Sequence, residues 1–77
     1  ADIRPVLQRY GRHRVKGKEW RLALDVLQRL AKMMREDEQA REWVYSELRE
    51  LGSIMREEKN LSGATEAYRL ASKYESE

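Results

Sequence analysis

Cysteine and phenylalanine are both absent from this sequence of 77 residues, which has a single proline and a single histidine. Without cysteine the chain can form no disulfide and no thiol-based site, and it suits a reducing compartment such as the cytoplasm. No apolar run approaches the roughly 18–20 residues of a membrane-spanning helix, and no signal peptide is visible, so we expect no membrane partner. The length allows one small domain over residues 1–77, and the missing initial Met suggests a fragment of a larger protein.

Groups that perform catalysis or bind metals are scarce as well. His13 is the single imidazole, and its position between Arg12 and Arg14 is typical of a solvated histidine in a basic turn. The acidic pairs at 37–38 and 57–58 lie near expected helix ends, where carboxylates serve as caps and solvated faces. The glycines are isolated and match no phosphate-binding loop. The sequence therefore predicts no enzyme, no metal site and no cofactor.

Helical periodicity, by contrast, runs through the whole chain. Apolar residues recur at helical spacing in four segments, and no segment alternates with period two. We expect helices over 3–15, 18–35, 37–58 and from 60 or 62 to 74, with Asp2 and Asp37 as N-caps. Because the connections are short, the prediction is an all-α fold of four antiparallel helices. The second helix is apolar over so much of its surface that we place it at the centre; its apolar residues are Trp20, Leu22, Ala23, Leu24, Val26, Leu27, Leu30, Ala31, Met33 and Met34.

Small and large residues alternate in a fixed order along the last two segments. Gly52 and Ala64 remove bulk where facing helices would cross, so the two axes can approach to about 8–10 Å. The series resembles the tetratricopeptide repeat, in which W-x2-L-G-x2-Y precedes an aromatic residue, an Ala, a large residue and a second Ala. In this chain it reads Leu48, Leu51, Gly52, Met55, Leu61, Ala64, Tyr68 and Ala71, with Leu48 in place of the Trp, Met55 in place of the Tyr and no closing Pro.

An internal repeat is visible at an offset of 41 residues, as from Leu7 to Leu48. The same offset pairs Tyr10 with Leu51, Gly11 with Gly52, Trp20 with Leu61, Ala23 with Ala64, Leu27 with Tyr68 and Leu30 with Ala71. The period of the family is about 34 residues, so roughly two helical turns are extra. The pattern predicts two stacked helix-turn-helix hairpins, over 3–35 and 38–75. The alternative is a simple four-helix bundle.

Charge is distributed unevenly although the net charge is only +2. Residues 1–35 carry ten Lys/Arg and three Asp/Glu, giving +7, and residues 36–77 carry six and eleven, giving −5. The two halves either attract each other within the fold or select a charged partner. In tetratricopeptide proteins the first helix of each repeat lines a groove that holds a peptide or a partner helix. The resemblance places Gln8, Arg12, Lys16, Arg49, Ser53 and Arg56 in such a groove, with Arg12 and Ser53 where the family's carboxylate clamp has Asn.

Most of these groove positions are basic, and Arg is suited to bidentate recognition of carboxylates. We therefore expect a protein-interaction or assembly module for an acidic peptide or helix. Pairing of these arginines with glutamates of the chain itself is the competing interpretation. Self-association, in which the basic half of one copy meets the acidic half of another, is a further alternative. Nucleic-acid binding, such as to RNA, is also an alternative, through a run of Arg9, Arg12, Arg14, Lys16, Lys18 and Arg21 flanked by aromatic residues.

Overall fold

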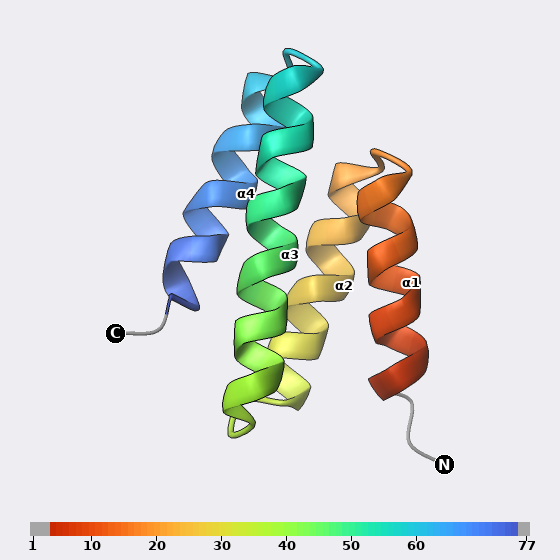
Figure 1. Ribbon diagram of the computed structural model, residues 1–77, viewed down its shortest axis with the longest axis vertical. Helices are drawn as coiled ribbons and strands as arrows, with labels where there is room; N and C mark the ends of the chain where they lie inside the picture. Colours follow the sequence, from red (N-terminus) through yellow and green to blue (C-terminus); the bar gives the residue numbers. More distant parts are fainter. Residues whose placement is uncertain (1–3, 76–77) are drawn as a thin grey trace.

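The computed structural model describes residues 4–75, and all regular structure in that range is α-helical (Figure 1). The helices are α1 (Arg4–Lys16), α2 (Trp20–Met33), α3 (Glu38–Glu57) and α4 (Leu61–Lys73). This confirms the predicted all-α fold of four helices. The proposed cap Asp2 and the first expected residue of the first helix lie outside the described residues.

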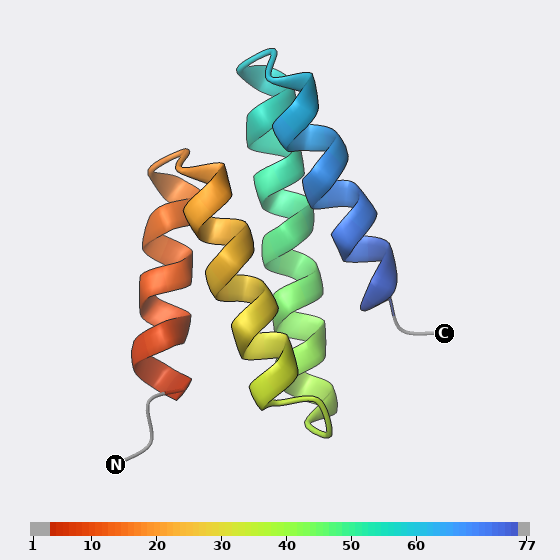
Figure 2. The ribbon, with the colours of Figure 1, turned by 180° about the vertical axis from the view of Figure 1, so that it is seen from behind.

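The helices form two layers. In Figure 1, α1 and α3 lie in front of α2 and α4, and Figure 2 shows α2 and α4 from the opposite side. Each helix packs on the next one in sequence, α1 also touches α3, and α2 also touches α4. Within residues 4–75, α1 and α4 do not touch each other, so the four helices form an open stack rather than a closed bundle. The Cα trace measures 38 × 28 × 13 Å, and its short dimension fits two layers of helices.

The core follows the centre of this stack. Helices α2 and α3 each contact all three other helices, so α2 shares with α3 the central position that its broad apolar surface predicted. Two residues of that surface, Leu22 and Met33, are nevertheless exposed. They point to the side of α2 that no other described helix covers, so periodicity identified the apolar positions but not which side has a neighbour. The largest fully buried side chains are Leu27, Leu30, Leu48, Leu51, Met55, Val15 and Val44.

The turns between α1 and α2 and between α3 and α4 have the same hydrogen bonds. Lys18 and Lys59 both adopt the left-handed conformation, with φ of 63° and 61°. In each turn the lysine and the residue after it donate backbone N–H groups to the carbonyls three and five residues back, which is the Schellman helix ending. The bonds run from Lys18 to Val15 (3.1 Å), Glu19 to Arg14 (3.1 Å), Lys59 to Arg56 (3.0 Å) and Asn60 to Met55 (2.8 Å).

Side-chain caps start the helices of the second hairpin. The Asp37 carboxylate accepts a hydrogen bond from the backbone N–H of Ala40 (3.1 Å), which confirms it as the N-cap of α3. Asn60 rather than Ser62 caps α4, accepting from the N–H of Gly63 (3.0 Å). The second helix begins two residues later than predicted, because the left-handed Lys18 cannot belong to it, and it ends at Met33 instead of residue 35.

Small residues set the distance between the helices of each hairpin. A Cβ on Gly52 would lie 2.8 Å from the ring of Tyr68, so any larger residue would have to displace that ring where α3 crosses α4. This contact confirms the role predicted for Gly52, and Ala64 is buried. In the first hairpin, a Cβ on Gly11 would lie 3.3 Å from Val26. The α1–α2 crossing is therefore close as well, but less tight.

Candidate partner-binding site

The groove residues expected on the first helix share one face of α1, because they follow each other at intervals of four residues. They are Gln8, Arg12 and Lys16. Gln8 lines a cavity of about 390 Å³ between the first turns of α1 and α3. Ala40 and Trp43 form the wall of this cavity on the α3 side, and Met34 lines it from the loop that precedes α3. Lys16 is exposed at the other end of α1. The face of α1 that carries the expected residues is thus turned toward α3.

Arg12, at the middle of this face, is held by carboxylates of α3. Its Nη1 donates to both oxygens of Glu47, at 2.9 and 3.1 Å, and the guanidinium also pairs with Glu50. Glu47 is the one buried charged residue among those described, with 7% of its surface exposed. A buried carboxylate needs a nearby cation to offset its lost hydration. The structure therefore places Arg12 in an internal ion pair that joins the two hairpins.

The three positions expected on the third helix also share a face. Arg49, Ser53 and Arg56 follow each other at spacings of four and three residues along α3. The Arg49 guanidinium lies 5.7 Å from the ring centre of Tyr45, with its Nη1 3.4 Å from the Tyr45 hydroxyl. Arg56 is exposed, and neither arginine has a carboxylate partner among the described residues. The basic stripe of α3, defined as Arg49, Ser53 and Arg56, is therefore open to a partner.

The six expected residues form two separate groups. Arg49 lies two positions after Glu47, which is about 200° around the helix. The basic stripe of α3 thus faces away from the seam where Arg12 meets Glu47. The repeat pattern groups all six residues because periodicity does not show which side of α3 receives α1.

The basic run expected for nucleic acid is largely engaged within the fold. Arg14 pairs with Glu19 and lies over the ring of Tyr10 at 4.7 Å, and Lys18 pairs with Glu58 in the neighbouring turn. The hydrogen bond to Glu19, followed by that to Tyr10, raises the pKa of the Arg14 guanidinium above its ordinary value. Arg21 stacks on Trp20 at 5.1 Å. With Arg12 paired to α3, the members of the run that have no such interaction among residues 4–75 are Arg9 and Lys16.

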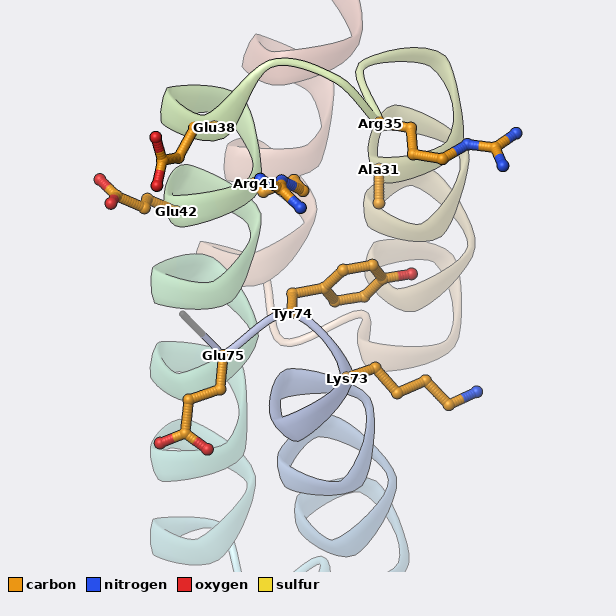
Figure 3. Close-up of a pocket in the computed structure, with 8 residues that line it drawn as sticks. All are labelled: Ala31, Arg35, Glu38, Arg41, Glu42, Lys73, Tyr74 and Glu75. Carbon is orange, nitrogen blue, oxygen red and sulfur yellow. The ribbon is translucent and has the colours of Figure 1, made fainter. Parts of the chain in front are cut away.

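A second cavity, of about 350 Å³, was not anticipated from the sequence. Figure 3 shows it where the ends of α2 and α4 meet the start of α3, with Arg41 pointing from α3 toward α2 and the Tyr74 ring below Ala31. Arg35 and Lys73 extend to one side of it, and Glu38 and Glu42 to the other. Three cationic side chains (Arg35, Arg41 and Lys73) and three carboxylates (Glu38, Glu42 and Glu75) line this cavity. Its formal charge is therefore zero, and the cavity favours no ion of either sign.

Residues 4–75 contain no group of three or more His, Asp or Glu side chains arranged to hold a metal ion. His13 is exposed near the end of α1. None of the described helices combines the length and apolar character that a membrane span requires.

No family model, no curated protein and no solved structure matches the chain.

Proposed function

We propose that this protein is a non-catalytic protein-interaction module built from two helical hairpins similar to tetratricopeptide repeats, and that it binds an acidic segment of a partner. Two observations support the repeat relationship. The turns have matching hydrogen bonds 41 residues apart, as between Lys18 and Lys59. A Cβ built on either of the matching glycines, Gly11 and Gly52, would lie within 3.3 Å of a side chain of the facing helix.

The basic stripe of α3 carries the proposal for the ligand. On the opposite side of α3, Glu47 and Glu50 are occupied by Arg12, so they do not neutralise the arginines of the stripe. Arg49 is also ordered by its contact with Tyr45, which lowers the side-chain entropy lost when a carboxylate binds. Two guanidinium groups on one helix face, roughly 10 Å apart along the axis, can each pair with a carboxylate of the same extended or helical peptide.

The test is the charge reversal of the stripe. The probe is a labelled peptide of about ten residues in which Glu alternates with Ala or Leu, and fluorescence anisotropy measures its affinity. We expect Arg49→Glu combined with Arg56→Glu to weaken binding about tenfold or more, with helicity unchanged by circular dichroism. Unchanged affinity would contradict the proposal.

Lys32→Glu combined with Lys73→Glu is the matched control. Both lysines are exposed and have no ion-pair partner among residues 4–75, and the double change alters the net charge by the same amount. An equal loss of affinity in the control would mean that peptide binding depends only on the net charge of the protein. A parallel titration with single-stranded RNA across a salt series should show no steep salt dependence, because most of the basic run is already paired.

A further inference from the structure

Four of the five large apolar side chains that are exposed among the described residues belong to the first hairpin. They are Val6 (61% exposed), Tyr10 (38%), Leu22 (46%) and Met33 (46%), whereas Leu61 lies at the start of α4. Val6 and Tyr10 are one turn apart on α1, and Leu22 and Met33 are three turns apart on α2, so each pair shares a helix face. We call these four residues, with Arg9, the outer face of the first hairpin.

In the second hairpin, the equivalent face is covered by other helices. The positions 41 residues further on are Glu47, Leu51, Gly63 and Tyr74. Glu47, Leu51 and Gly63 are buried, and Tyr74 is half-buried. The covering element is the first hairpin itself, since Arg12 bonds to Glu47 and a Cβ on Gly63 would lie 3.0 Å from Trp20. The outer face of the first hairpin is thus the equivalent of a surface that, in the same molecule, is packed against helices.

The charge on the outer face is opposite to that of its covered equivalent. Glu50, which pairs with Arg12, corresponds to Arg9, and Glu47 corresponds to Val6. Arg9 is exposed and has no ion-pair or hydrogen-bond partner among residues 4–75. A helix packed here as the first hairpin packs on the second must therefore present a carboxylate where Arg12 presents a guanidinium.

We infer that the outer face of the first hairpin docks an amphipathic helix of a partner protein, with an apolar stripe over Val6, Tyr10, Leu22 and Met33 and a flanking carboxylate against Arg9. This surface is separate from the basic stripe of α3, so the inference goes beyond the proposed function. Apolar burial supplies the affinity, and the carboxylate fixes the orientation and excludes basic helices.

A second copy of the chain does not meet these requirements. Its own open side would have to present a carboxylate at the position equivalent to Arg12. That position is Ser53, and Arg49 and Arg56 lie on either side of it. Stacking of copies in the order seen within the chain would bring these arginines toward Arg9, and like charges in such an arrangement repel.

The experiment uses the full 77-residue chain and two labelled probe peptides. The acidic probe is an amphipathic helix of about 18 residues, or five turns, with a Leu/Ala stripe flanked by Glu, and the second probe has Lys in place of each Glu. Fluorescence anisotropy gives both affinities. We expect the acidic probe to bind at least about tenfold more tightly than the basic one, and Arg9→Glu to reduce that preference.

Two further variants locate the binding. Leu22→Ser should weaken binding of the acidic probe about tenfold, because it removes an exposed apolar contact without creating a cavity in the core. Arg56→Glu changes the charge as Arg9→Glu does but lies on the basic stripe, so it should weaken binding of the acidic probe less than Arg9→Glu does. Circular dichroism checks that every variant keeps its helix content.

Three results would overturn the inference. The first is failure of the acidic probe to bind, or equal binding of both probes. The second is loss of binding in Arg56→Glu with none in Arg9→Glu, which would assign the probe to the basic stripe and leave the proposed function intact. The third is a dimer in sedimentation that Leu22→Ser dissociates, which would make a second copy the occupant.

Discussion

The α1–α2 hairpin and the α3–α4 hairpin close in the same way but have different surroundings. Each turn has a left-handed lysine with the same pair of backbone hydrogen bonds, and each crossing has a buried glycine. Leu51 is fully buried, however, whereas Tyr10 at the matching position is exposed. Local features therefore fix the backbone of each hairpin. The order of stacking then decides which apolar residues become core and which remain a surface.

The largest difference between the hairpins should appear at this matched pair. We expect Leu51→Ala to lower the free energy of unfolding by about 3 kcal/mol, because it leaves a cavity at a fully buried site. Tyr10→Ala should cost less than about 1 kcal/mol, since its ring is partly solvated and lies under the Arg14 guanidinium. Urea denaturation of both variants measures the difference. Equal losses would mean that the first hairpin is covered in solution.

The ion pair between the hairpins gives the next largest effect. Arg12→Met should destabilise the fold by about 2 kcal/mol, because it leaves the buried Glu47 carboxylate without its cation. Adding Glu47→Leu, which gives α3 an apolar residue where α1 has Val6, should restore most of that loss. A double-mutant cycle in urea measures the coupling. If the two single effects simply add, the pair does not hold the hairpins together.

The smallest difference in stability between the hairpins should appear when each crossing glycine is replaced by alanine. Gly52→Ala places a Cβ 2.8 Å from the Tyr68 ring, and we expect a loss of about 1–2 kcal/mol even after the gain in helix propensity. At Gly11 the nearest side-chain atom is 3.3 Å away, so Gly11→Ala should be nearly neutral. Thermal unfolding of the two variants tests the ranking. A larger loss of stability in Gly11→Ala would show that the α1–α2 crossing is the tighter one, which would contradict this prediction.

Much of this fold could be predicted from the sequence because its signals are local. Helical periodicity identified four helices, Asp37 identified the start of α3, and Gly52 with Ala64 identified a close crossing. The left-handed Lys18 was missed because glycine is the residue that favours this conformation, and Gly17 precedes it. Its hydrogen bonds depend on the path of the whole turn, which composition does not reveal.

The candidate site was less predictable because it depends on contacts between distant residues. Arg12 and Glu47 are 35 positions apart, and nothing local shows that one neutralises the other. Exposure of Leu22 and Met33 likewise depends on which side of α2 receives a neighbour. The cavity at Arg41 and Tyr74 forms only where three helix ends meet. These features require the stacking order, and periodicity does not supply it.

Amide hydrogen exchange by NMR at the two hairpin turns tests the matched-hairpin account most directly. The account predicts that the backbone N–H groups of Glu19 and Asn60 are both protected, with left-handed chemical shifts at Lys18 and Lys59. Rapid exchange of either amide, or a right-handed shift at either lysine, would show that the two hairpins do not share one geometry and would contradict it.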